Sequence, residues 1–313
     1  MATELSNADL QRVLHTTVTT RFAKVFNQAD AEVVYRRLVT ELPVAGRRLE
    51  FPYGILTGRM REWIGDRVVN QIETGYWSQT VRDYEYTLAI KRRDIDDDLI
   101  GLYKPIIDDI GGIAAREPDQ LMADVLIAGE SASQPCYDGK ALFATDHPVN
   151  PAQPSGTTFS NLRTSRSLTP DNFEYGQMEM RRLTGPDGRV LGMRGRLLVV
   201  GPQLETTAKR IVENDLVVET AGDGAVTNIH KGAAQVVVVD RLDEVNSGLS
   251  WYLVDDMKPL RFLLLGTRQA PRMVARSSET DDVVFSRREF QWGIDARWVA
   301  APGLPQTAIK FRP

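Results

Sequence analysis

Apolar residues near the start of the chain follow a helical spacing. They recur at steps of three and four, at Leu10, Val13, Leu14, Val18, Phe22, Val25 and Phe26. This spacing places them on one face of an α-helix. A narrow apolar stripe can dock on the chain's own core or on a neighbouring subunit, and the sequence leaves both alternatives open.

Two strand-like patterns enclose a polar stretch further along the chain. Apolar and polar residues alternate over residues 49–53 and again over residues 84–90, as they do in strands with one buried face. Between these segments, glycines are mixed with aromatic and charged residues, at Gly54, Gly58, Gly65 and Gly75. The arrangement predicts a long hairpin or an extended flap.

The longest helical pattern covers residues 95–126. Acidic residues between positions 94 and 98 precede it and complement the positive end of a helix macrodipole. Pro105 and the neighbouring pair Gly111 and Gly112 interrupt the apolar spacing. We therefore expect a kink or a break in this helix.

The remainder of the chain combines a long loop with alternating helices and strands. Residues 131–167 are rich in Pro, Ser, Thr and Gly, and they predict a loop with short ordered pieces. Thr169 followed by Pro170 is typical of a helix start. Strands are predicted from continuous apolar runs at residues 197–200, 236–239 and 251–254, and from strict two-residue alternation over residues 290–298. The fold class is predicted to be α+β, with several substructures.

Composition limits the possible classes of protein. The 313 residues are 42% apolar and 26% charged, which is typical of a soluble globular protein. The net charge of −4 argues against a dedicated nucleic-acid binder, because neutralising many phosphates needs clustered Lys and Arg. The chain shows neither a secretory signal nor a run of roughly 18 apolar residues, so we expect no membrane partner. A single cysteine, Cys136, excludes an intrachain disulfide framework and fits synthesis in a reducing cytoplasm.

Candidate chemistry is sparse. The three histidines, His15, His147 and His230, are widely spaced and form no metal-binding pattern. The acidic run at residues 94–98 resembles the start of a calcium loop, but Leu99 stands where that loop needs a glycine. No phosphate-binding or serine-hydrolase motif occurs. We therefore predict no catalytic residues, no metal and no cofactor, and we keep a hydrolase using Asp146 and His147 as an alternative to a turn at these positions.

Several segments, in order along the chain, carry a family resemblance. They are residues 84–90, 137–148, 168–173, 197–205, 251–255 and 290–297. The two most specific are Tyr-Asp-Gly-Lys-Ala-Leu-Phe-Ala-Thr-Asp-His-Pro at 137–148 and Trp-Tyr-Leu-Val-Asp at 251–255. With these segments the chain resembles the major head subunit of Mu-like phages and prophages, the gpT family.

The resemblance implies a Hong Kong 97-type phage capsid fold. We expect an N-terminal arm over residues 1–45 and an extended hairpin loop over residues 46–92. A peripheral domain with a long spine helix would comprise residues 93–165 and 269–313. An axial domain would comprise residues 166–268.

The resemblance also implies a function. The chain would be the major capsid protein of a tailed bacteriophage or prophage, not an enzyme, and would assemble into an icosahedral shell around the DNA genome. We expect Trp63, Tyr76 and Trp77 to anchor the hairpin loop on a neighbouring subunit, because large aromatic side chains in a glycine-rich flap have little core of their own to fill. The alternative is that these three side chains pack within the loop.

Partners follow from the same resemblance. The chain would bind other copies of itself in pentamers and hexamers, a scaffold or protease protein, a portal protein and, as a further candidate, a decoration protein. It would touch the packaged DNA without sequence preference. We expect the chain to be located in the virion capsid, which would be assembled in the cytoplasm of the bacterial host. A nanocompartment shell of the same fold, enclosing a cargo enzyme instead of DNA, is the main alternative function.

Overall fold

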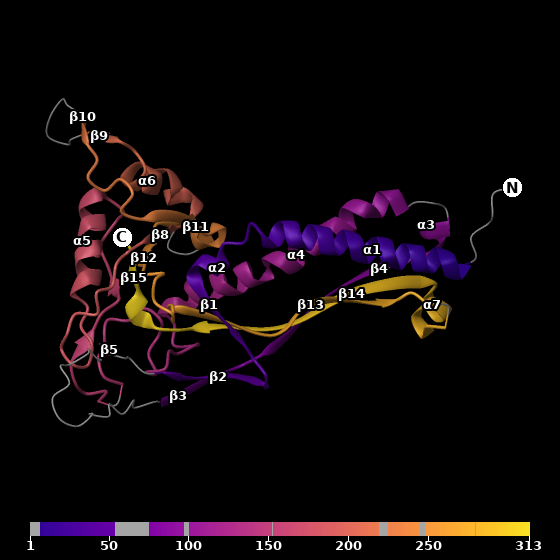
Figure 1. The fold of residues 1–313 in the computed structure, drawn as a ribbon, viewed down its shortest axis with the longest axis horizontal. Coiled ribbons are helices and arrows are strands. Elements are labelled where there is room, and N and C mark those ends of the chain that lie inside the picture. The colour runs from indigo at the N-terminus through magenta and orange to yellow at the C-terminus, as the bar shows by residue number, and fades with distance from the viewer. Residues whose placement is uncertain are drawn as a thin grey trace, which may run out of the picture.

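The molecule is elongated and has two parts. The structure is a computed structural model that describes residues 7–53, 75–96, 100–151, 153–218, 225–244, 248–278 and 280–313. A long sheet with two helices along it forms one end of the molecule, and a smaller sheet flanked by helices forms the other (Figure 1). The mixture of helices and sheets confirms the predicted α+β class.

The long sheet has the strand order β1-β13-β14-β4. Its antiparallel centre consists of β13 (Leu263–Arg276) and β14 (Glu289–Pro302). Strand β4 (Arg82–Lys91) pairs antiparallel with β14, and β1 (Val39–Pro43) pairs parallel with the first part of β13. Alternate side chains of β14 are buried, as the two-residue periodicity predicts, at Phe290, Trp292, Ile294, Ala296 and Trp298.

Two helices cover one face of this sheet. Figure 1 shows α1 (Asn7–Asp30) and α4 (Ile100–Ile127) side by side along the strands. Phe22 of α1 and Ile110 of α4 lie in one buried cluster with Ile294 of β14. The Arg21 guanidinium Nε of α1 also donates to Asp108 Oδ1 of α4 at 3.0 Å. For the side chains that the structure describes, the apolar stripe of the first helix therefore packs on the chain's own core.

The predicted break in the long helix is absent. Helix α4 continues through Pro105, Gly111 and Gly112. A Cβ atom at Gly111 would lie 3.1 Å from the carbonyl oxygen of Phe22 and 3.2 Å from the amide nitrogen of Phe26. The glycine therefore permits close approach of α1 and does not end the helix. The acidic residues before it begin in a separate short helix, α3 (Arg92–Asp96), and residues 97–99 lie outside the described ranges.

The smaller sheet has five strands in the order β11-β8-β12-β15-β7. They are β11 (Gln235–Val238), β8 (Leu197–Val200), β12 (Trp251–Val254), β15 (Ala308–Phe311) and β7 (Leu162–Arg163). Strand β12 is antiparallel to both of its neighbours, while the two outer pairs are parallel. The three strands predicted from continuous apolar runs all lie in this sheet.

Two helices pack on the smaller sheet, α5 (Pro170–Arg182) and α6 (Pro202–Val212). The amide of Asn172 donates to the Thr169 hydroxyl oxygen at 3.2 Å, which confirms the predicted helix start. Buried side chains of α5 and α6 join those of the strands in one apolar cluster that includes Phe173, Ala208, Leu198 and Phe311.

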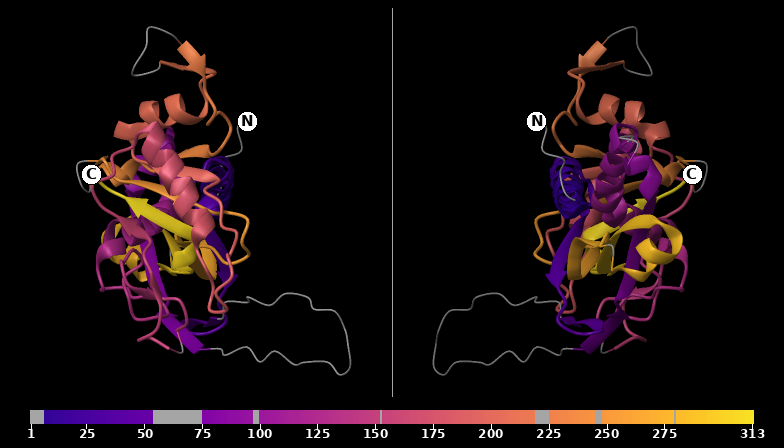
Figure 2. Two further views of the ribbon diagram at one scale, coloured as in Figure 1. Left: turned by 90° about the vertical axis from the view of Figure 1, so that its left-hand side faces the viewer. Right: turned by 90° about the vertical axis from the view of Figure 1, so that its right-hand side faces the viewer.

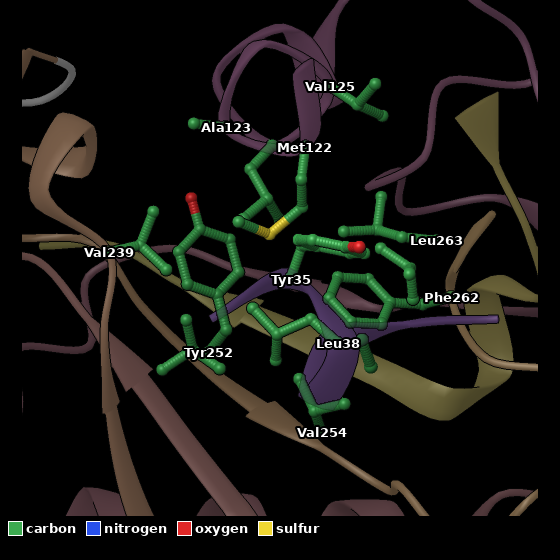
Figure 3. Close-up of a cluster of buried hydrophobic side chains, with 14 of the residues drawn as sticks. Tyr35, Leu38, Met122, Ala123, Val125, Val239, Tyr252, Val254, Phe262 and Leu263 are labelled. Atoms are coloured by element: carbon green, nitrogen blue, oxygen red, sulfur yellow. The ribbon is translucent and has the colours of Figure 1, made fainter. Parts of the chain in front are cut away.

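The two parts share a core. The largest cluster of buried side chains joins the end of α4 to strands of both sheets, and Figure 3 shows Met122 of α4 pointing toward Tyr35 and Tyr252. Strand β15 lies beside β12, although residues 308–311 belong to the segment 269–313 that we assign to the peripheral domain. The division into arm, hairpin, peripheral and axial parts stays a proposal, and both β7 and β15 cross it, since they lie in segments assigned to the peripheral domain but pair in the smaller sheet.

Short elements complete the fold. The hairpin strands β9 (Leu216–Val218) and β10 (Ala225–Thr227) project from the smaller sheet, while α7 (Asp282–Arg287) lies at the opposite end of the molecule (Figures 1 and 2). No helix in the described ranges is both long and apolar enough to cross a membrane. The remaining short elements are α2 (Tyr35–Leu38), η1 (Ala128–Glu130), β5 (His147–Pro148), β6 (Thr158–Phe159), η2 (Asp240–Glu244) and η4 (Pro305–Thr307).

Candidate functional site: the hairpin base and the loop beneath it

A hairpin follows the first predicted strand, but its second strand differs from the one predicted. Strand β2 (Arg48–Tyr53) pairs antiparallel with β3 (Gly75–Thr80), with Phe51 opposite Trp77 and Tyr53 opposite Gly75. Among the strands that the structure describes, these two pair only with each other. Residues 54–74 between them lie outside the described residues, and Trp63 is among them. The structure therefore confirms the strand at residues 49–53 but not its predicted partner, because residues 84–90 lie in β4 and pair with β14 of the long sheet. The role of Trp63 stays a prediction.

Trp77 packs within its own chain. Its side chain is 8% exposed and lies in a cluster with Leu49 of β2, Leu264 of β13 and Val299 of β14. The indole Nε1 donates to the carbonyl oxygen of Pro135 at 3.1 Å. Trp77 thus packs within its own chain, but against the long sheet and not within the loop as the alternative had it. This side chain fixes the hairpin base to the long sheet.

Tyr76 neighbours Trp77 in β3, and its backbone pairs with Pro52. Its side chain lies outside the described part of the structure. Of the three aromatic residues predicted at the interface, the structure places two consecutively in one strand. Only Tyr76 and Trp63 remain candidates for direct contact with a neighbouring subunit.

The loop beneath the hairpin is the most specific sequence segment, residues 137–148. The Tyr137 hydroxyl accepts a hydrogen bond from Gln306 Nε2 at 2.8 Å, which ties the loop to η4. The amide of Phe143 donates to the carbonyl oxygen of Gly129 at 2.7 Å, at the end of the long helix. Asn161 is fully buried, and its Nδ2 donates to the carbonyl oxygens of Leu142 and Pro305. The loop therefore joins the long helix, the smaller sheet and the hairpin base.

A buried acid and a histidine lie in this loop. His147 Nδ1 and Asp138 Oδ2 are 2.6 Å apart, and their side chains are 0% and 1% exposed. The imidazole stacks on Phe159 of β6, with ring centroids 5.1 Å apart. Its Nε2 is also buried and has no hydrogen-bond partner within the described residues. An imidazole closed off in this way cannot exchange protons with a substrate.

Asp146, the other residue of the hydrolase alternative, is bound to Lys140 and not to the histidine. Its carboxylate is 54% exposed and forms an ion pair with Lys140. Hydrogen bonding from Lys140 lowers the pKa of the Asp146 carboxyl, with nearby positive charge adding to the effect. The side chains of Asp146 and His147 therefore do not act together, because one is in solvent and the other is bound to Asp138. Sequence adjacency suggested the wrong acid, and Asp138, nine positions away, is the real partner.

Cys136 is not an alternative nucleophile. Its side chain is buried, and burial raises the pKa of the thiol well above its usual range, with the Asp138 carboxylate raising it further. A protonated, inaccessible thiol is unreactive. Within the described residues, no group of three or more His, Cys, Asp or Glu side chains could hold a metal ion.

A charged contact ties the C-terminal strand to the long helix. The Lys310 ammonium, 1% exposed, lies 2.8 Å from Glu130 Oε1, and Arg312 lies 3.0 Å from the other oxygen of Glu130. The aromatic rings of Phe143 and Tyr252 surround the ammonium at 5.8 and 5.5 Å from their centroids. Burial and the charge of Glu130 raise the pKa of the Tyr252 hydroxyl above its usual range. This contact fixes β15 to the junction that carries the loop.

Comparisons with known proteins agree with this architecture. A family model described as the Mu-like prophage major head subunit gpT matches residues 11–167, 162–242 and 243–312. The major capsid protein of Escherichia phage Mu is 27% identical over 253 residues, which are 81% of this chain and 58% of that protein. The Mu-like prophage FluMu major head subunit of Haemophilus influenzae is 24% identical over 249 residues, 80% of this chain and 56% of that protein. The chain thus spans less than two thirds of the length of both relatives.

A solved structure shows the fold. A chain in the procapsid of bacteriophage JBD30 superposes with a TM-score of 0.56 at 24% sequence identity, covering 96% of this chain and 75% of that chain. The Hong Kong 97-type capsid fold that the sequence resemblance implies is thereby confirmed. Because the family model matches almost the whole length and the fold agrees with it, the chain belongs to the family of Mu-like prophage major head subunits.

Proposed function

We propose that this chain is the major capsid protein of a tailed bacteriophage or prophage, and that many copies assemble into an icosahedral shell around a DNA genome. The observation that carries the proposal is the match of the head-subunit family from residue 11 to residue 312. The family is one of structural head subunits, so the proposed role is assembly and not catalysis. Stability would come from many modest contacts repeated by symmetry.

Each part of the chain would have its own task in the shell. We assign residues 93–165 and 269–313 to a peripheral domain, with α4 as its spine helix. Residues 166–268 would form an axial domain at the five-fold and six-fold centres. The arm (residues 1–45) and the hairpin loop (residues 46–92) would contact neighbouring subunits. In support, the hairpin strands β2 and β3 pair with no other strand in the described ranges.

Trp63 and Tyr76 are the proposed contact residues of the hairpin loop. Trp77 has a positioning role, because its burial against β13 and β14 fixes the direction in which the loop leaves the subunit. A change at Trp77 would therefore affect both folding and assembly. Changes at Trp63 or Tyr76 would affect assembly alone.

The proposed partners are those of a phage head. The chain would form pentamers and hexamers with itself and would bind a scaffold or protease protein and a portal protein during assembly. A decoration protein is a further proposed partner, and contact with packaged DNA would be non-specific. Assembly would take place in the cytoplasm of the bacterial host, and in the mature virion the chain would be part of the capsid.

Two alternative functions are less well supported, for different reasons. A nanocompartment shell has the same fold, but the family match is to a phage head subunit, so we do not favour it. The hydrolase alternative required Asp146 and His147 to act together. The Asp146 carboxylate pairs with Lys140 in solvent, whereas His147 is buried and pairs with Asp138, and these contacts contradict the hydrolase alternative.

The direct test is assembly of the purified chain. The chain would be expressed with and without a scaffold protein and examined by size-exclusion chromatography and negative-stain electron microscopy. Rings, tubes or spheres are the expected result. A monomer or dimer under every salt and scaffold condition would overturn the proposal. Particles purified from a lysogen should contain nuclease-protected DNA, whereas a protein cargo without DNA would favour the nanocompartment.

Paired variants separate contact from folding. Trp63→Ala is expected to abolish particles while leaving the melting temperature of the subunit unchanged. Trp77→Ala is expected to lower that temperature as well, because truncating a buried tryptophan costs about 3–5 kcal/mol. Normal particles from Trp63→Ala would remove Trp63 from the proposed interface. An unchanged melting temperature for Trp77→Ala would contradict its role at the hairpin base.

A further inference from the structure

A groove runs between helices α1 and α4. Two adjacent hollows of about 590 and about 470 Å³ share Ala29, Glu32, Arg116 and Gln120 in their walls, so they form one continuous trough. We call it the α1–α4 groove. Its wall on α4 reaches from Asp108 to Gln120, which corresponds to roughly 18 Å of helix at about 1.5 Å per residue.

The floor of the groove is apolar and open. Ile113, which points away from the sheet side of α4, is 45% exposed. At Gly112 nothing lies within 4 Å of the position that a Cβ atom would take. The floor therefore leaves room for an apolar side chain from outside the subunit.

The rim of the groove is acidic. Glu32, Asp109 and Glu117 line it, have no ion-pair partner within the part of the chain that the structure describes, and outnumber Arg116, the basic residue of the same stretch of wall. Burial raises the pKa of the Glu117 carboxyl, and repulsion from Asp124 adds to the effect, while Arg241 opposes it. A positively charged group brought to this rim would offset both the repulsion and the desolvation.

A complementary surface lies at the far end of the same chain. Phe285 of α7 is 85% exposed, the highest value among the large apolar side chains that the structure describes. Arg287 and Arg288 follow it, are both exposed, and have no ion-pair partner within the described ranges. One exposed aromatic ring beside two unpaired cations matches a groove with an apolar floor and an acidic rim. We call residues 285–288 the α7 knob.

The two surfaces cannot meet within one chain. Figure 1 shows α7 at the tip of the long sheet, near the first turns of α1, whereas the groove is lined by the last turns of α1 and the middle of α4. A contact between them must join two copies. Such a contact is heterologous, because each copy offers a different surface to each neighbour, and it can repeat around a symmetry axis.

We infer that the α7 knob of one subunit docks in the α1–α4 groove of a second copy of this chain, with Phe285 over Ile113 and Gly112 and the two arginines against the acidic rim. The inference rests on the proposed shell function, because it describes one of the contacts that would hold the shell together. It adds a named pair of surfaces to that proposal. A basic segment of a different protein is the competing occupant of the groove.

Cysteine pairing tests the contact directly. Purified Phe285→Cys and Gly112→Cys subunits would be mixed, assembled and oxidised with copper phenanthroline, and linked pairs measured by non-reducing electrophoresis. The native Cys136 is buried and contributes no background. As a matched control, Phe285→Cys would be mixed with Val190→Cys, since Val190 is 61% exposed and lies outside both surfaces. We expect at least tenfold more linked pairs with Gly112→Cys than with Val190→Cys.

The outcomes separate this inference from the proposed function. Particles that form without excess linkage over the control overturn the docking contact alone and leave the groove to another occupant. Failure of the unmodified chain to assemble under every condition overturns both. A second measurement uses Gly112→Trp, which fills the groove, and Phe285→Ala. Both variants should lower the assembled fraction about tenfold without lowering the subunit's melting temperature, and normal assembly of both variants would also overturn the contact.

Discussion

Two adjacent glycines in α4 offer a matched test of how closely the first helix packs. Replacing glycine by alanine inside a helix stabilises it by about 1 kcal/mol, because alanine loses less backbone entropy on folding. At Gly112 the new methyl group meets nothing within 4 Å, so the full gain is expected. At Gly111 the methyl group would lie 3.1 Å from the carbonyl oxygen of Phe22 and 3.2 Å from Val25 Cβ.

The crowding at Gly111 sets the expected magnitude. Ordinary carbon contacts begin at about 3.5 Å, so α1 would have to move away by a few tenths of an ångström. Overpacking of this kind costs about 1–3 kcal/mol, which offsets or exceeds the helix gain. Gly111→Ala is thus expected to be about 1–3 kcal/mol less stable than Gly112→Ala. The two substitutions have the same chemistry, so helix propensity cancels from the comparison.

Thermal unfolding of the unassembled subunit checks this prediction. One kcal/mol moves the melting temperature of a domain of this size class by about 2–4 °C, so the two variants should differ by at least about 2 °C. Gly112→Ala should unfold above the unmodified chain. Equal stabilisation by both substitutions would show that α1 does not lie tightly against α4, and would refute the packing argument.

Three other substitutions test buried or repelling charges. Glu130→Ala leaves the buried Lys310 ammonium without its carboxylate, and denaturant titration should show a loss of about 3–5 kcal/mol. Asp138→Ala removes the partner of His147 Nδ1 and should cost about 1–3 kcal/mol in the same assay. Glu117→Gln removes a carboxyl group whose pKa is raised by burial in the folded chain. Folding therefore favours the protonated form of Glu117. At about pH 7 the variant should have a higher melting temperature than the unmodified chain, and at about pH 4, below the ordinary pKa of a glutamate, this difference should disappear.

Glu130 and Asp138 each have an exposed neighbour as control, and for Glu117 the control is the comparison between the two pH values. Arg312→Ala and Asp146→Ala remove partly exposed members of ion pairs and should cost less than about 1 kcal/mol. Losses as large as those of Glu130→Ala and Asp138→Ala would mean that burial is not what makes the two inner contacts strong. For Glu117→Gln, a gain in melting temperature that is the same at both pH values would contradict the role of its charge.

Local structure could be predicted from the sequence. The alternation over residues 290–298 requires only that one face of a strand be buried, and it was confirmed in β14. The cap at Thr169 was equally local, since the hydroxyl reaches an amide three residues ahead. Patterns of this kind depend on neighbours within one or two turns and need no knowledge of the rest of the fold.

Contacts between segments that are distant in the sequence could not be predicted from it. Apolar spacing shows which face of α4 is buried but not that Gly111 meets the backbone of α1. The aromatic composition of the flap suggested an exposed Trp77, yet Pro135 and the long sheet bury it. The adjacent pair at 146–147 suggested a catalytic acid, although the histidine turns inward to Asp138. In each case a tertiary partner, invisible to a local pattern, decided the outcome.

The position of β15 has a consequence for synthesis on the ribosome. It lies between β12 and β7 in the smaller sheet, so the edge of β12 stays unpaired until residue 311 has left the exit tunnel. At about 5–20 residues per second, the roughly 50 residues between these strands leave that apolar edge open for several seconds. During this interval the nascent chain can be recognised by chaperones or can pair with another nascent chain. The Trp251 indole, which stacks on Phe311 with ring centroids 3.9 Å apart, would report by its fluorescence when the sheet has closed.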